Sequence, residues 1–180
     1  ADPNSMGVTS VRTILEDRDG QLWVGGYNGF DRLDRKTGRF EHLPQSWPHG
    51  IVRVLREDPD EPGRITWLGM ESGQPHLIAF DRIQKRIWKQ FNFIERFGFD
   101  TQQIRDILLE AGGSTWVGTD AGLLQFNRRT GAFTRMIHDA ADPGSLGHNQ
   151  VNAIVRASDG NLWVGTMGGG LGRFDPTTGR

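Results

Sequence analysis

The sequence predicts an all-β protein that forms part of a β-propeller, in which four-stranded antiparallel sheets, the blades, repeat around an axis. Three observations predict this fold. A Trp-[Val/Leu]-Gly triplet recurs four times, a short β-branched stretch precedes each triplet, and the chain has 25 glycines in 180 residues. The intervals between the tryptophans are 44, 49 and 47 residues, which is typical of repeat architectures. The triplets begin at Trp23, Trp67, Trp116 and Trp163.

The first strand of each repeat, strand A, is predicted from an apolar pattern with spacing i, i+3, i+4. This spacing also fits a helix, but the stretches are short, rich in β-branched residues and mostly end at Asp-Gly or Gly-rich turns. Strand A precedes its tryptophan by 12 residues in three copies and by 16 in copy two, and we assign the extra four residues to the turn DPDEPGR. The four patterns are Val11-x-x-Ile14-Leu15, Ile51-x-x-Val54-Leu55, Ile104-x-x-Ile107-Leu108 and Val151-x-x-Ile154-Val155.

Three further strands complete each repeat. Strand B carries the tryptophan triplet, and strand C ends in Leu-Asp, Phe-Asp or Phe-Asn before a turn such as KTGR. Strand D follows in three copies only, as FEHL, IWKQFNF and FTRMIHD. The whole chain, 1–180, is therefore predicted to be a partial propeller of fifteen strands in about four blades, with the last outer strand missing. The blades are expected at 8–45, 51–93, 104–139 and, incomplete, 151–176.

Both faces of each blade are expected to be covered, because the strands do not alternate apolar with polar residues. We expect the motif tryptophans to pack between neighbouring blades, with the glycines of the triplets allowing close approach of the sheets. Sugar-binding platforms are the alternative role for the tryptophans. The end blades would need further blades of a longer parent chain or a second copy of this chain. The motif glycines are Gly25, Gly69, Gly118 and Gly165.

Several kinds of site are not expected. The net charge of −1 disfavours a nucleic-acid partner, and the absence of cysteine excludes disulfides and cysteine metal sites. No apolar stretch reaches the length of a membrane span, so we expect no membrane contact by this chain. The acidic turns at 16–20 and 158–160 do not fit a calcium loop, and the glycine run 168–170 opens no helix. The five histidines share no motif, so no metal, cofactor or catalytic residue is assigned.

Ligand-binding residues are expected in the loops that leave one end of the blades. Strand A enters from that end, so the D–A loops and the B–C turns emerge together, and loops on a rigid scaffold often carry binding residues. Trp47 interrupts the repeat in the loop 45–50, beside His49; a tryptophan that covers the end of a blade is the alternative. The other candidates are Arg96, Phe97 and Gln103 in the loop 94–103, and Tyr27 and His76 in B–C turns.

The repeated motif resembles the two-component regulator propeller repeat. Copy four shows this best in SDGNLWVGTMGGGLGRFDPTTGR, and copies one and three keep DGQLWVGGYNGF and WVGTDAGLLQFNRRTGAF, whereas copy two diverges as WLGMESGQPHL. The resemblance implies a seven-bladed or larger propeller in the periplasmic sensor region of a bacterial signalling protein anchored in the inner membrane, ahead of a histidine kinase or other output domain. Some relatives respond to saccharides, so the ligand implied is a small molecule, with a saccharide as one class.

Two other functional classes stay open at this point. A propeller enzyme of the streptogramin-lyase type would need His and Glu side chains that converge at the centre of the loop face. A purely structural module for protein interaction would present a flat, apolar loop face. We expect a non-catalytic sensor propeller, in which ligand binding biases how propellers pack and the membrane protein transmits that bias to its output domain.

Overall fold

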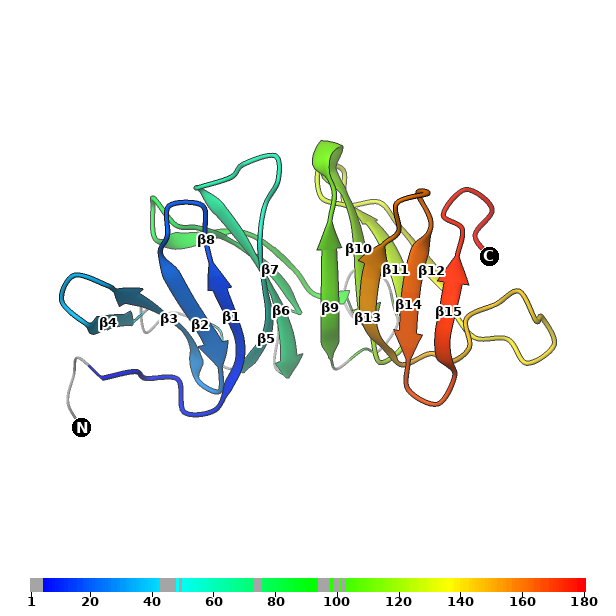
Figure 1. Ribbon diagram of the computed structural model, residues 1–180, viewed down its shortest axis with the longest axis horizontal. Coiled ribbons are helices and arrows are strands. Elements are labelled where there is room, and N and C mark those ends of the chain that lie inside the picture. The colour runs from blue at the N-terminus through cyan, green and yellow to red at the C-terminus, as the bar shows by residue number, and fades with distance from the viewer. Residues whose placement is uncertain are drawn as a thin grey trace. The chain divides into compact units, whose positions relative to one another are not determined.

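The computed structural model describes residues 5–42, 48, 50–72, 76–93, 98, 101 and 103–180. In these residues all long elements are strands, and each sheet is an antiparallel meander in sequence order (Figure 1). The first two sheets are β1 (Val11–Glu16), β2 (Leu22–Gly26), β3 (Gly29–Asp34) and β4 (Arg39–His42), then β5 (Ile51–Glu57), β6 (Ile65–Ser72), β7 (Leu77–Asp81) and β8 (Arg86–Phe91). The next two are β9 (Ile104–Leu109), β10 (Ser114–Thr119), β11 (Gly122–Asn127) and β12 (Phe133–Met136), then β13 (Val151–Arg156), β14 (Leu162–Thr166) and β15 (Gly170–Phe174).

The sheets confirm the predicted all-β fold of short antiparallel blades. Three sheets have four strands and the last has three, with β15 at its edge. The chain divides into two compact units, Ala1–Phe99 with the first two sheets and Asp100–Arg180 with the other two. Each unit is described by itself below. The treatment of 1–180 as one partial propeller, its blade limits and the number of blades beyond these four sheets stay predictions.

Strand A of copy two is offset by one residue from the sequence alignment. Leu15 pairs with Trp23 in the first sheet, but Arg56 pairs with Trp67 in the second. A second register shift, between Ile51 and Val52, leaves Glu71 of β6 outside the pairing, because Ile51 pairs with Ser72 and Val52 pairs with Met70. The assignment of four extra residues to the A–B turn was therefore wrong: the turn contains three extra residues, and the fourth is Ile51, which precedes the counterpart of Val11. Val52 is consequently the counterpart of Val11.

The turn that follows each strand C is fixed by the side chain of an Asp or Asn that ends the strand or, for β15, directly follows it. In each blade an oxygen of this Asp or Asn accepts a backbone N–H from two residues further on, which is the Asx-turn arrangement. Asn performs this role in blade three as Asp does in the others, so the turn requires the side-chain oxygen and not the charge. The pairs are Asp34–Lys36 at 2.9 Å, Asp81–Ile83 at 3.0 Å, Asn127–Arg129 at 2.9 Å and Asp175–Thr177 at 2.7 Å.

The buried Asp81 carboxylate also accepts a hydrogen bond from Arg64 Nε at 3.0 Å. Burial raises the pKa of Asp81, but the Gln84 N–H, the Arg64 guanidinium and the Ile83 N–H outweigh it, so the pKa lies below its ordinary value of 3.8. A carboxyl with a lowered pKa in the folded state stabilises the fold above its unfolded pKa, and this stabilisation is lost as the pH falls through the folded pKa.

Asp81→Asn is expected to lower the free energy of unfolding by about 1 kcal/mol at pH 7, because the turn survives but the charged partner of Arg64 is lost. Urea denaturation from pH 7 to pH 3 checks this. The wild-type and variant stabilities should converge as the pH falls below about 4. A stability difference that stays constant over this pH range would contradict the assignment.

In the first unit, the two sheets pack through the motif residues of β2. Trp23 lies 6.3 Å, centroid to centroid, from Phe80 of the second sheet, and Phe30 lies 5.1 Å from the same ring. These residues belong to one buried apolar cluster with Val52, Leu55, Leu68, Met70 and Ile78. A Cβ on Gly25 would lie 2.8 Å from Val52 Cγ1, so the glycine is what allows β2 to approach β5. This tryptophan and this glycine thus lie at the contact between the two sheets of the unit.

A buried ion pair also joins these two sheets. Arg82, which follows β7, contacts the Asp17 carboxylate of the first sheet's A–B turn, and these side chains are 5% and 3% exposed. Asp17 also accepts the indole N–H of Trp23 at 2.8 Å, and Arg82 donates to Glu57 at 2.5 Å. The interface between the sheets therefore combines an apolar centre with a desolvated charge pair at its A–B turn end.

The second unit repeats this packing between its own sheets. Trp116 lies 5.7 Å, centroid to centroid, from Phe174, and both belong to a cluster with Leu146 of the D–A linker, Leu123, Val151, Ile154, Leu162 and Val164. A Cβ on Gly118 would lie 2.9 Å from Val151 Cγ1 and 3.0 Å from Val151 O. Asp106 Oδ2 also accepts the backbone N–H of Ile154 at 2.9 Å. β10 and β13 thus approach as β2 and β5 do.

The tryptophan of the last sheet differs from its counterparts. Trp163 is 42% exposed, whereas Trp23 is 4% exposed, and Leu171 and Val155 near it are also exposed. A Cβ on Gly165 would meet nothing closer than Ala153 Cβ at 3.7 Å. Trp23 and Trp116, which face a following sheet of their own unit, are thus buried, whereas Trp163 has no following sheet in its unit. Additional blades or a second copy as partners of this face stay a prediction.

A search of the described helices found none of the length and apolar character that crossing a membrane requires.

Candidate functional site

The D–A loops and the B–C turns lie at the same end of the sheets. In three blades the first residue of the B–C turn donates its backbone N–H to the residue just before strand A: Tyr27 to Ser10 at 3.2 Å, Asp120 to Gln103 at 3.3 Å, and Met167 to Gln150 at 2.9 Å. This repeated contact ties each B–C turn to the start of its own innermost strand. The predicted common loop face is therefore present in each unit.

Every innermost strand contains a register shift next to this loop face. The shifts lie between Val11 and Thr13, between Val52 and Val54, and between Val151 and Ala153; in β9, Ile104 pairs with Thr119 and Asp106 pairs with Gly118. One residue is left outside the pairing in each case, as in a β-bulge, which redirects a side chain and is common beside functional sites. The four bulge residues are Arg12, Arg53, Arg105 and Asn152.

In the first unit the two bulge arginines converge on one carboxylate. Arg12 Nε lies 3.2 Å and Arg53 Nη1 lies 3.4 Å from Oε2 of Glu71, which stands near the end of β6. β1 and β5 are neighbouring strands, which brings these side chains together. Arg12 also lies over the ring of Tyr27, with its Cζ 5.2 Å from the ring centroid, and its Nη2 is 3.5 Å from the Tyr27 hydroxyl. Two cations, one carboxylate and one aromatic ring thus form a compact cluster, which we call the arginine cluster.

In the second unit the equivalent bulge residues contact each other. Arg105 Nη1 donates to Asn152 Oδ1 at 3.2 Å, and β9 and β13 are neighbouring strands. The bulge side chains of adjacent blades are therefore linked through Glu71 in the first unit and contact each other directly in the second. Asn152 in place of arginine lowers the positive charge of this second pair.

The predicted ligand-binding residues have different positions. Tyr27 is part of the arginine cluster and is partly exposed. Gln103 lies beside the B–C turn of blade three, where its N–H is 3.4 Å from Asp120 Oδ1. His76 is buried, stacks on Phe93 at 5.7 Å and accepts the Phe93 N–H through Nδ1 at 3.1 Å. Trp47, His49, Arg96 and Phe97 lie outside the described residues. Ligand contact by any of these residues stays a prediction.

The arginine cluster was not found by sequence reasoning, although a signal for it is present. An arginine follows the first apolar residue of strand A in Val11-Arg12, Val52-Arg53 and Ile104-Arg105. The alignment of Ile51 with Val11 matched Arg12 with Val52 and concealed the repetition. Once the register is corrected, the arginine occurs at one position in three of four copies.

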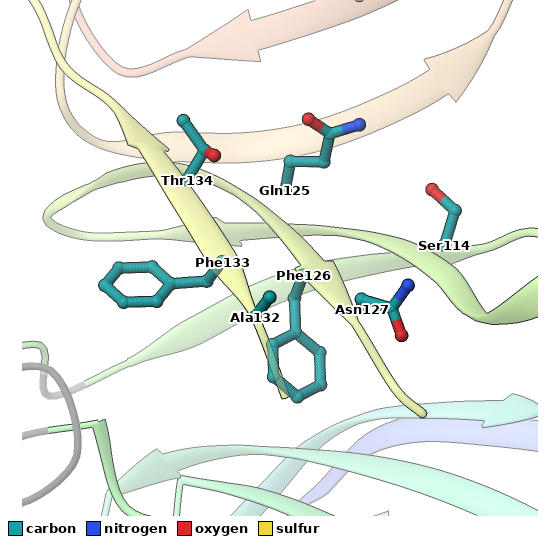
Figure 2. Close-up of a pocket in the computed structure, with 7 residues that line it drawn as sticks. All are labelled: Ser114, Gln125, Phe126, Asn127, Ala132, Phe133 and Thr134. Atoms are coloured by element: carbon teal, nitrogen blue, oxygen red, sulfur yellow. The ribbon is translucent and has the colours of Figure 1, made fainter. Parts of the chain in front are cut away.

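A hollow of about 300 Å³ lies on the outer strands of blade three, at the end with the C–D turn (Figure 2). Gln125 and Thr134 are cross-strand partners and point together to one side of the strands, while Phe126 and Phe133 point away from them. Ser114, Asn127 and Ala132 complete the lining. The hollow offers amide and hydroxyl groups but no charge, and it lies at the opposite end of the blade from the loop face.

Among the residues that the structure describes, no group of three or more His, Cys, Asp or Glu side chains has the arrangement of a metal site.

Meandering antiparallel sheets that pack innermost strand beside innermost strand define a propeller-type repeat protein, with its loop face marked by the B–C turns. Comparison with known families specifies the repeat, since the two-component regulator propeller family matches residues 5–28 and 145–168. Two segments of the chain are therefore similar to the repeat of the two-component regulator propeller family, the repeat that the sequence resemblance implied.

Solved structures of extracellular domains share this fold. The extracellular domain of the putative hybrid two component system BT4673 from B. thetaiotaomicron is 27% identical over 96% of this chain, with a TM-score of 0.78. A second structure of the BT4673 extracellular domain, described as that of a putative one component system, is 27% identical over 96% of this chain, with a TM-score of 0.75. The extracellular domain of BT3049 from the same organism is 24% identical over 96% of this chain, with a TM-score of 0.60, and shows the fold alone.

The chain spans only 22% of the BT4673 domain and 27% of the BT3049 domain. The comparison with curated proteins found no match to this chain.

Proposed function

We propose that this chain is part of a non-catalytic sensor propeller in the periplasmic region of a bacterial two-component signalling protein. It binds a small molecule at its loop face, and the signalling protein transmits the resulting change in propeller packing through the membrane to an output domain. The observation that carries this proposal is the similarity of nearly the whole chain to the extracellular domain of a putative hybrid two component system. The matching repeats of the regulator propeller family support it.

The loop face is the part of the chain best suited to bind a ligand. The B–C turns are held in place by backbone contacts to the strands, so the side chains that they carry stand on a rigid base. Two of these side chains, Tyr27 and Met167, are large, apolar and partly exposed. A ligand that contacts such turns in one packing arrangement of the propeller and not in another shifts the population between them.

The test uses the full-length signalling protein with a transcriptional reporter of its output. Changing Tyr27 and Met167 to alanine is expected to raise the inducer concentration needed for half-maximal output by about tenfold, which corresponds to about 1.4 kcal/mol of lost binding free energy. Ile83→Ser is the control, because Ile83 is also a large, exposed apolar side chain but lies in a C–D turn at the opposite end of the sheets. An unchanged response of the double variant, or an equal loss in the control, would refute the proposal.

A further inference from the structure

We infer that Arg12 and Arg53 form a binding site for an oxyanion, the carboxylate or sulfate group of a small ligand. The inference rests on the proposed function and deepens it by naming the chemical class of the ligand. It begins from the geometry of the arginine cluster, where two guanidinium groups from neighbouring blades approach the same carboxylate oxygen, at 3.2 and 3.4 Å. A single oxyanion can therefore be bound by both arginines at once.

The contact with Glu71 shows that Arg12 and Arg53 recognise a carboxylate, but Glu71 does not occupy all of their N–H donors. Each guanidinium has five N–H donors in a planar fork that suits carboxylate, sulfate and phosphate groups. In the described part of the chain, Arg12 and Arg53 contact Glu71 and the Tyr27 hydroxyl through three of their nitrogen atoms. The charges of the cluster sum to a positive value, and the arginine side chains are 37% and 32% exposed. A second oxyanion thus meets positive charge that solvent can reach.

Tyr27 gives the site an aromatic wall. Its ring lies under the Arg12 guanidinium, an arrangement that holds the cation in one orientation. The turn that carries Tyr27 is fixed at the backbone by the Ser10 carbonyl and by an isolated bridge to Ile51 of the next blade. The guanidinium is therefore positioned before the ligand arrives, which reduces the entropy lost on binding. The exposed part of the ring offers an apolar surface to the carbon skeleton of the ligand.

The repeat indicates that the arginines do not serve the fold alone. Blade four has the same register shift in strand A with Asn152 at the bulge, so the bulge forms without arginine. Arginine nevertheless stands at this position in the other three blades. Placing like charges at one position of neighbouring strands is unfavourable unless an anion compensates them. Glu71 compensates part of this charge in the first unit, and an external oxyanion accounts for the rest.

The experiment measures binding of succinate and of sulfate to the whole chain by isothermal titration calorimetry, with sodium chloride at matched ionic strength as the reference. Wild-type protein is expected to bind at least one of the two probes. Arg12→Gln and Arg53→Gln should each weaken that binding by about tenfold or more. Glu71→Gln removes the internal carboxylate and should tighten it by several-fold. The charge-matched control is Arg39→Gln on the outer strand β4, which should leave the affinity unchanged.

Several results would overturn the inference. These are no binding of either probe to the wild-type chain, an equal loss of affinity in Arg39→Gln, or weaker binding in Glu71→Gln. Weaker binding in Glu71→Gln would mean that Glu71 contacts the ligand and does not compete with it for the arginines. Arg12→Lys keeps the positive charge but loses the planar guanidinium donors, and it replaces the glutamine variants as the test if these do not fold. A folded Arg12→Lys protein should bind the probe several-fold more weakly than wild type. Wild-type affinity in this variant would overturn the inference.

The two proposals fail in different ways. If neither probe binds while the Tyr27 and Met167 changes still alter the reporter response, the oxyanion site is wrong and the sensor function stands. The opposite outcome has three parts: the probes bind to wild-type protein, the arginine variants no longer bind them, and the Tyr27 and Met167 changes leave the reporter response unaffected. In that case the oxyanion site stands and the sensor function is wrong.

Discussion

Replacing Arg82 with methionine is expected to lower the free energy of unfolding of the first unit by about 3–5 kcal/mol. Methionine has a similar length and keeps the apolar packing, but it leaves the buried Asp17 carboxylate without its cation. Asp17 cannot move into solvent, because it also accepts the Trp23 indole N–H and the backbone N–H groups of Asp19 and Gln21. The uncompensated charge therefore stays at the interface between the sheets. Urea denaturation followed by circular dichroism measures the loss.

Arg35→Met is the matched control for this prediction. Arg35 follows strand C of blade one as Arg82 follows strand C of blade two, but it pairs with Glu16 at 2.9 Å where the side chains are 48% and 58% exposed. Exposed ion pairs contribute about 0–1 kcal/mol, so this change should have a small effect. Equal effects at the two positions would show that burial of the charge pair between the sheets does not govern its contribution.

Gly118→Ala is expected to destabilise the second unit by about 1–3 kcal/mol. The added methyl group would lie 2.9 Å from Val151 Cγ1 and 3.0 Å from the Val151 carbonyl oxygen. The contact with a backbone atom matters most, because a side chain can change its rotamer but the carbonyl moves only with β13. The two sheets must therefore separate slightly, which loosens the packing of Trp116 against Phe174. Thermal and urea denaturation of the variant measure the loss.

The same substitution at Gly165 should have the opposite sign. Gly165 holds the same position in the triplet of blade four, but the nearest atom to an added Cβ is Ala153 Cβ at 3.7 Å, an ordinary contact. Replacing a strand glycine by alanine without strain stabilises a protein by about 0.4–1 kcal/mol, because the unfolded chain loses conformational freedom. Destabilisation by Gly165→Ala as large as that by Gly118→Ala would mean that the triplet glycine is needed within its own sheet and not between sheets.

The arrangement of strands could be predicted from the sequence because each blade is specified locally. The turns contain their own signals, such as the Asp or Asn that ends strand C and accepts the backbone N–H groups of its turn. The triplet places Trp23 and Gly25 two residues apart, so both point to one face of β2. In blades one and three this face contacts the next sheet of the same unit.

The arginine cluster was not predicted, because recognising its repeated arginine requires the correct strand register. An alignment of apolar residues treats Ile51 as the start of strand A, since isoleucine and valine are equivalent in such a pattern. The pairing of Arg56 with Trp67 shows that Val52 is the true counterpart of Val11. The one-residue difference decides which side chain stands at the bulge, because side chains alternate between the two faces of a strand.

The sequence by itself determined the all-β fold and the number of strands in these repeats, because these properties follow from turn chemistry and from the period of the repeat. Only the tertiary structure decided that Arg12, Arg53, Glu71 and Tyr27 meet, and that Asp17 and Arg82 form a buried pair. These groups lie far apart along the chain. Their contacts depend on how one sheet stacks on the next and on a bulge that redirects one side chain, and neither has a signal that is local in the sequence.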